Sequence, residues 1–188
     1  MPRVLLIKPR RFADERGWFS ETYSRRDATA LGVPDEFVQD NHSLSRATGT
    51  VRGLHFQTPP HGQGKLVRCT AGRIRDYAVD IRRGSPTYGR HLSVELSAAN
   101  GWQLYVPVGF AHGFVTLEPD CEVVYKVTSY YAPAHDGGLR FDDSEIGIDW
   151  PLPPTGATVS DKDGRLPGFH AFDSPFPYDG DPLPAELA

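Results

Sequence analysis

The sequence is poor in cysteine and has no long apolar run, and both shortages exclude classes of protein. Two thiols, Cys69 and Cys121, are too few for a disulfide framework or a zinc motif, so we expect both to be reduced and buried, although the sequence leaves a single bridge between them open. No stretch approaches the ~18 apolar residues of a spanning helix. The N-terminal run at residues 4–7 is also too short for a signal peptide. We therefore expect no membrane partner and a cytoplasmic location.

Basic charge is also scarce. The chain has 20 Lys and Arg against 24 Asp and Glu, a net charge of −4, whereas a domain that binds nucleic acid usually carries a basic surplus. We expect no nucleic-acid partner. The 188 residues fit one domain, residues 1–188, and an apolar fraction of 39% is enough for a packed core.

Turn-forming residues are abundant, with 19 glycines and 17 prolines. Only residues 24–31 have a helical pattern, which Gly32 and Pro34 end. Short runs rich in β-branched and aromatic residues recur between turn signals, which predicts an antiparallel barrel or sandwich with short helical segments. These runs are residues 67–69, 77–81, 91–96, 103–106 and 122–127. The domain core is expected at about 3–168, followed by an irregular C-terminal arm at about 169–188.

Residues 50–57 form a strand-like segment that contains two candidate functional side chains. Strict alternation places His55 on one face and Arg52 on the other. A histidine in such a strand is more often structural than catalytic. Gly53, however, lies between them, and a glycine inside a strand often marks a bulge, which would bring Arg52 and His55 to the same side.

Other candidates lie on neighbouring segments. Lys65 alternates with Val67 and Cys69, and an inward lysine is costly unless it meets a carboxylate or faces a ligand pocket. His112 lies in a tight apolar segment, and Tyr125 alternates with core positions. Each also has an ordinary structural interpretation: a core histidine, and a core tyrosine with a hydrogen-bonded hydroxyl. The charged loop 160–164 has the composition of a solvated turn.

Three common kinds of site lack their motifs. There is no His-x-His pair with a nearby glutamate, which disfavours a metal-binding cupin. There is no glycine-rich phosphate loop that opens a helix, and no serine in a nucleophile elbow.

The order of segments resembles the dTDP-4-dehydrorhamnose 3,5-epimerase family from about residue 3 to 168. The motifs that carry the resemblance are Asp-Glu-Arg-Gly at 14–17, residues 37–43, Arg-Gly-Leu-His-Phe-Gln at 52–57, residues 64–69, 79–82, 84–87 and 109–114, Tyr-Lys at 125–126 and Ser-Asp-Lys-Asp at 160–163. The resemblance implies a cupin-type jelly-roll barrel, a homodimer, and neither a metal nor an organic cofactor. The reaction it implies is epimerisation of dTDP-4-keto-6-deoxyglucose at C3 and C5, which gives dTDP-4-keto-L-rhamnose in dTDP-rhamnose biosynthesis.

The family's functional residues transfer to matching positions. The resemblance implies that His55 is the base, with Asp163 as its carboxylate partner, and that Tyr125 is the acid. It implies dTDP-sugar contacts from Arg16, Phe19, Glu21, Gln39, Asn41, Arg52, Lys65, His112, Tyr131 and Lys162. The sequence departs from the family pattern at Ser20 and Tyr105, outside the catalytic set.

Three alternatives stay open. A relative that acts at C3 only, on a related dTDP-4-keto-6-deoxy sugar in a secondary-metabolite pathway, would use the same three catalytic groups. A metal-dependent cupin oxygenase would need ligands that the spacing does not provide. A non-enzymatic sugar-nucleotide binding module would keep the arginines but would not need the histidine, aspartate and tyrosine.

Overall fold

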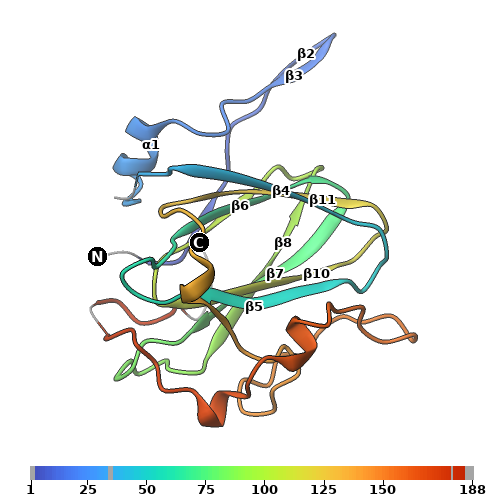
Figure 1. Ribbon diagram of the computed structural model, residues 1–188. Helices are drawn as coiled ribbons and strands as arrows, with labels where there is room; N and C mark the ends of the chain where they lie inside the picture. The colour runs from blue at the N-terminus through green and yellow to red at the C-terminus, as the bar shows by residue number, and fades with distance from the viewer. Residues whose placement is uncertain (1–2, 34–35, 179, 185–188) are drawn as a thin grey trace.

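Two antiparallel β-sheets face one another in the computed structural model, which describes residues 3–33, 36–178 and 180–184 (Figure 1). One sheet has the order β1 (Leu5–Ile7), β9 (Gln103–Val106), β6 (Lys65–Ala71), β11 (Cys121–Val127), β4 (Gln39–Ser45). The other has the order β12 (Asp136–Gly138), β5 (Val51–Gln57), β10 (Phe110–Thr116), β7 (Arg73–Asp80), β8 (His91–Ser97). The predicted all-β barrel is confirmed, as are its predicted strands.

The core between the sheets consists of the side chains that alternate inward. Val67, Ile74, Leu104 and Val123 are completely buried in one apolar cluster that joins both sheets. Burial of this kind contributes about 25 cal/mol per Å² of apolar surface. Cys69 and Cys121 belong to the same cluster and are free thiols, as expected.

The C-terminal chain covers the outer face of the second sheet (Figure 1). Trp150 and Phe176 pack there against Val79 and Ala111. Within its described residues, the arm beyond residue 168 contains one 3-10 turn, η3 (Phe169–Ala171), and is otherwise irregular, as predicted. Its residue 179 and its last four residues, 185–188, lie outside the described residues.

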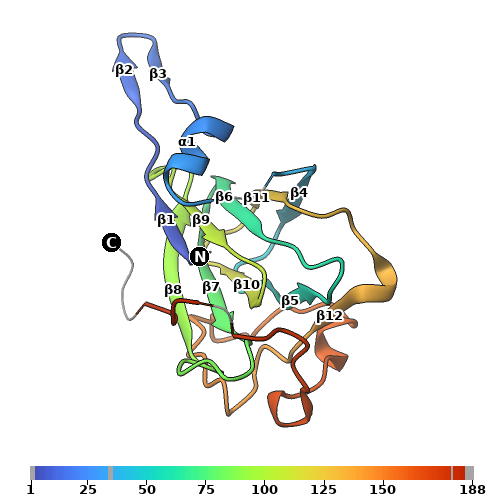
Figure 2. The same ribbon diagram turned by 90° about the vertical axis from the view of Figure 1, so that its left-hand side faces the viewer.

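A two-stranded hairpin, β2 (Phe12–Asp14) and β3 (Gly17–Phe19), projects away from the barrel (Figure 2). Helix α1 (Arg25–Ala30) follows it, as predicted, and begins where the Ser24 hydroxyl accepts a hydrogen bond from the Asp27 amide. The predicted stop at Pro34 lies outside the described residues. No helix of the described residues is long and apolar enough to cross a membrane.

Gly53 creates the expected irregularity in β5. Along the β5–β10 pair, His112 opposes His55 and Phe114 opposes Arg52, so two steps on β10 match three on β5. The φ of Gly53 is +140°, and a Cβ there would lie 2.5 Å from the Gly113 Cα. The bulge turns Arg52 and His55 to the same side, as predicted from the glycine.

Replacing Gly53 with alanine should destabilise the fold by about 1–3 kcal/mol, because the new Cβ meets backbone atoms that cannot move independently. Urea unfolding followed by circular dichroism measures this change. The matched control is Gly164→Ala, where a Cβ would meet nothing closer than 4.0 Å. Equal stability of the two variants would contradict this explanation of the bulge.

Candidate active site

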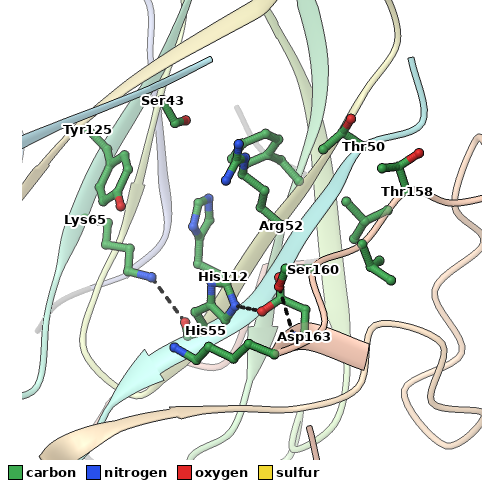
Figure 3. A pocket seen from close by; sticks show the side chains of 14 residues that line it. Ser43, Thr50, Arg52, His55, Lys65, His112, Tyr125, Thr158, Ser160 and Asp163 are labelled. Carbon is green, nitrogen blue, oxygen red and sulfur yellow. Dashed lines mark hydrogen bonds and ion pairs between the residues drawn. The ribbon is translucent and has the colours of Figure 1, made fainter. Parts of the chain in front are cut away.

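A cavity of about 480 Å³ opens between the two sheets, next to the loop at residues 158–163 (Figure 3). Both sheets contribute side chains to its lining, through β4, β5, β6, β10 and β11. Seven of the predicted site residues meet here: Arg52, His55, Lys65, His112, Tyr125, Lys162 and Asp163. The first and last of these seven residues in the sequence, Arg52 and Asp163, are 111 residues apart.

His55 and Asp163 form a carboxylate–imidazole pair at the floor of the cavity (Figure 3). The His55 Nε2 lies 2.7 Å from the Asp163 Oδ1. A carboxylate only accepts hydrogen bonds, so the imidazole donates its Nε2–H. The neutral ring then carries its lone pair on Nδ1, which makes Nδ1 the basic nitrogen.

The short 3-10 turn η2 (Asp163–Arg165) fixes the position of the Asp163 carboxylate. Burial alone would raise the pKa of Asp163, but the hydrogen bond and charge of His55, with help from the Gly53 amide and Ser160, hold it below its usual value. Asp163 therefore remains ionised and can stabilise an imidazolium on His55 after proton transfer.

Lys65 points from β6 into the same cavity. Its side chain is only 7% exposed, and its ammonium donates to the His55 backbone carbonyl at 3.2 Å (Figure 3). Burial lowers the pKa of Lys65 to about 8, and the charges of Asp76 and Asp136 oppose that effect. No carboxylate of the described residues bonds it directly, so the second sequence interpretation, a lysine that faces a pocket, is the one the structure supports.

Tyr125 and Arg52 line another part of the cavity wall. Burial raises the pKa of the Tyr125 phenol, so it keeps its proton and is suited to donate it. Arg52 is fixed by two contacts to β4: its Nε donates to the Ser45 hydroxyl and its Nη2 to the Leu44 carbonyl, both at 3.0 Å.

His112 also faces the cavity, but its main partner was missed by the sequence analysis. Its Nε2 lies 2.7 Å from the Oδ1 of Asp76, a fully buried residue of β7. The signal was present, because Asp76 alternates with Ile74 and Ala78 on a buried face, where a carboxylate needs a partner. Burial lowers the pKa of His112 in spite of that carboxylate.

Three more predicted residues, Gln39, Asn41 and Tyr131, lie beside the cavity without lining it. The Tyr131 hydroxyl and the Lys162 ammonium both bind Asp136, a second partner that the sequence analysis missed. The Gln39 Oε1 accepts from the Tyr131 amide at 3.2 Å, and its Nε2 donates to Asn41 at 2.8 Å. Gln39, Asn41 and Tyr131 thus form one hydrogen-bonded edge beside the cavity. Asp136, the first residue of the three-residue strand β12, gave no local signal.

The remaining three predicted residues are not brought to this cavity. Arg16 and Phe19 belong to the projecting hairpin, where Arg16 pairs with Asp14 and Phe19 is 69% exposed. Glu21 lines a separate cavity of about 300 Å³ between that hairpin and α1.

Two buried side-chain oxygens in the described part of the chain have no hydrogen-bond partner: the Ser43 Oγ and the Asp76 Oδ2. Ser43 lines the cavity from β4 (Figure 3). Because buried polar atoms are rarely left unpaired, Ser43 is suited to bind a ligand group. Among the described residues, no group of three or more His, Cys, Asp or Glu is arranged to hold a metal.

This arrangement is suited to moving a proton next to a carbonyl group. A carboxylate-oriented histidine from one sheet and a protonated tyrosine from the other share a cavity with a buried ammonium, which can stabilise an enolate oxygen. The class that the fold and cavity define is therefore an acid–base isomerase on a jelly-roll barrel.

Comparison of the sequence with known proteins identifies the family within that class. The family model described as dTDP-4-dehydrorhamnose 3,5-epimerase matches residues 1–171, and the chain belongs to this family. It is 52% identical over 179 residues to dTDP-4-dehydrorhamnose 3,5-epimerase of Sinorhizobium fredii. This alignment covers 93% of this chain and 89% of the relative. The predicted family and its cupin-type fold are confirmed.

Solved structures agree. The dTDP-6-deoxy-D-glucose-3,5-epimerase of Legionella pneumophila, in complex with dTDP-4-keto-L-rhamnose, matches with a TM-score of 0.89 at 40% identity over 94% of each chain. A 3'-monoepimerase of Streptomyces bikiniensis, in complex with dTDP-quinovose, has a TM-score of 0.82 at 31% identity, covering 89% of this chain and 84% of the other.

Replacing Lys65 with methionine should stabilise the fold at pH 7 by about 1–3 kcal/mol, because it removes a buried charge that no carboxylate contacts. The folded-state pKa of Lys65, about 8, lies below its ordinary 10.5, so the folded wild type binds its proton less tightly than the unfolded chain. Wild-type stability should therefore rise from pH 8 to pH 10.5, and the advantage of the variant should shrink over that window.

Thermal unfolding across this pH range measures the effect. The control is Lys126→Met, which removes a lysine that pairs with exposed Asp40 on the outer face of the sheet. A Lys65→Met variant less stable than wild type at pH 7 would show that the ammonium has a stronger partner than these contacts provide.

Proposed function

We propose that this protein epimerises dTDP-4-keto-6-deoxyglucose at C3 and C5 to give dTDP-4-keto-L-rhamnose, without a metal or an organic cofactor. The observation that carries the proposal is the pairing of His55 with Asp163 in a cavity that also holds Tyr125 and Lys65. Membership of the family supports the substrate class.

The first step is proton removal. A hydrogen on a carbon next to the C4 ketone is acidic because its loss gives an enolate. His55 Nδ1 takes this proton, and Asp163 stabilises the imidazolium that forms. The electron pair of the broken C–H bond moves into the ring, and the ketone oxygen becomes an oxyanion. The Lys65 ammonium binds that oxyanion in a cavity where burial strengthens the interaction.

The second step returns a proton from the opposite face. Tyr125 lies on β11, in the sheet that faces the one holding His55, and its phenol is protonated at neutral pH. Donation from this side regenerates the ketone with inverted configuration at the carbon. Proton exchange with solvent then returns His55 to its neutral form and Tyr125 to its protonated form. Epimerisation at both C3 and C5 requires each carbon in turn to lie between these two groups.

The nucleotide part of the substrate needs cationic contacts. Arg52 and Lys162 line the cavity and are suited to the diphosphate. Lys162 is held at the rim by Asp136, and the hydrogen bond between them raises the pKa of Lys162, so its charge persists at neutral pH. Ser43 supplies a further hydroxyl to this cavity.

We propose a homodimer in which the hairpin completes the cavity of the other subunit. Arg16 and Phe19 belong to the hairpin of β2 and β3, which projects from the barrel (Figure 2), and neither lines the cavity of its own chain. The hairpin also exposes Phe12 and Trp18, and aromatic residues exposed together in this way are typical of a protein interface. A second copy of the chain would cover them and receive the guanidinium of Arg16.

Epimerisation at C3 alone is the second candidate. The 3'-monoepimerase of Streptomyces bikiniensis shares the fold, so the fold does not separate the two reactions. The higher identity to the 3,5-epimerase of Sinorhizobium fredii favours reaction at both carbons.

Solvent deuterium uptake tests the function directly. The protein is incubated with dTDP-4-keto-6-deoxyglucose in D₂O, and the sugar is followed by mass spectrometry and NMR. We expect deuterium at both C3 and C5 with inverted configuration. Label at C3 alone would assign the C3-only reaction, and tight binding without label would refute the catalytic assignment.

The same assay applied to His55→Asn tests the base. Turnover should fall by ~10²–10⁴, the usual contribution of a general base, while binding of dTDP measured by calorimetry changes little. The control is His42→Asn, which removes an exposed histidine paired with Glu122 on the outer face of the barrel. Equal losses of turnover and binding in His55→Asn would instead support a binding module.

Subunit mixing tests the shared cavity. Arg16→Ala and His55→Asn should each be nearly inactive, but a heterodimer holds one complete site, formed by the intact His55 of one chain and the intact hairpin of the other. Random exchange of subunits should restore about a quarter of wild-type activity. No recovery after confirmed exchange, or a ~21 kDa monomer in sedimentation at micromolar concentration, would refute the shared cavity.

A further inference from the structure

Asp76 is a buried carboxylate that the mechanism above does not use. It lies in the middle of β7, is 0% exposed, and has one hydrogen-bond contact among the described residues, to the His112 Nε2 at 2.7 Å. Its other oxygen has no partner there. A buried carboxylate of this kind is costly and demands an explanation.

The fold places this carboxylate behind the cavity. On β10, His112 pairs with Ala78 and Phe114 pairs with Asp76, so Asp76 lies diagonally across from His112 on the same inner face. His112 and Lys65 both line the cavity, whereas Asp76 does not. Asp76 therefore reaches a bound sugar only through its neighbours, and it is not a catalytic residue in its own right.

We infer that Asp76 is a positioning residue for the epimerisation, which holds His112 as its Nε2–H tautomer and supplies the negative charge that keeps the buried Lys65 ammonium protonated. The inference rests on the proposed function, because it assumes that Lys65 stabilises an enolate. It extends that function by adding a second histidine–aspartate pair, whose part is to set charge and not to take a proton from the sugar.

The tautomer follows from the geometry. Asp76, as a carboxylate, only accepts hydrogen bonds, so the neutral His112 ring donates its Nε2–H and carries its lone pair on Nδ1. Burial lowers the pKa of His112, which favours this neutral form. A neutral imidazole adds no positive charge next to Lys65, whereas an imidazolium would repel it.

The charge on Lys65 follows from a balance of neighbours. The ionisable groups around Lys65 come from several elements: Asp76 on β7, His112 on β10, Arg52 and His55 on β5, Tyr125 on β11, Asp136 on β12, Lys162, and Asp163 in η2. Asp163 is paired with His55, and Asp136 with Lys162. Among these carboxylates, Asp76 alone has a buried oxygen without a hydrogen-bond partner in the described residues, and its charge is the largest influence that opposes the burial of Lys65.

Asp76→Asn removes the charge and keeps the shape. Lys65 should then lose its proton at lower pH, so the high-pH limb of the kcat profile should move down by about one pH unit. Near pH 7, kcat should fall by about 10–100-fold, the scale known for carboxylates that orient metal-ligating histidines, while KM changes little. The control is Tyr77→Phe, the next residue on β7, whose ring packs against Trp150 on the opposite face of the sheet. Its profile should match that of wild type.

Nitrogen-15 NMR of the wild-type protein provides a readout that does not depend on the variant's folding. The His112 signals, assigned by their loss in His112→Gln, should report the Nε2–H tautomer at neutral pH. An Nδ1–H tautomer, or an unmoved high-pH limb in a folded Asp76→Asn, would overturn the inference. Failure of the wild type to take up deuterium would instead refute the proposed function, so the two failures are distinguishable.

Discussion

The contact between His55 and Asp163 is the interaction on which the site depends, because it joins a strand of the barrel to the loop that closes the cavity. The carboxylate comes from a segment 108 residues further along the chain and also accepts from the Gly53 amide. One carboxylate, positioned by the 3-10 turn η2, thus orients the histidine and contacts the bulge that turns it inward. The proposed chemistry requires both contacts.

The cavity combines groups with opposite demands. Lys65 must remain charged where burial disfavours charge, and Tyr125 must remain neutral, which burial favours. Both conditions hold in one cavity because its three carboxylates lie in different places. Asp163 pairs with His55 at the floor, and Asp136 pairs with Lys162 at the rim. Asp76 lies behind the wall, where it pairs with His112. A uniform apolar cavity would not keep Lys65 charged.

Much of this was predictable from the sequence. Runs rich in β-branched and aromatic residues located five of the strands, Gly53 predicted the bulge, and the inward position of Lys65 predicted either a carboxylate partner or a ligand pocket. Strand β4 was missed because Gln39, Asn41 and Ser43 give its inner face a polar pattern that resembles a loop. Asp76 was missed because its partner His112 lies 36 residues away in the sequence, and Asp136 was missed because its short segment has no strand pattern. Arg16 and Phe19 were predicted at the site, but in a single chain they lie on the projecting hairpin and do not line the cavity.

The close approach of β5 and β10 has an evolutionary consequence. A side chain at Gly53 would strike the Gly113 Cα, and one at Gly113 would lie 2.9 Å from the Arg52 carbonyl. Neither strand can therefore gain a methyl group at this crossing while the other keeps its present course. Among descendants of this chain, we expect Gly53 and Gly113 to be kept together or replaced together, because a side chain at either position requires the backbone of the other strand to move.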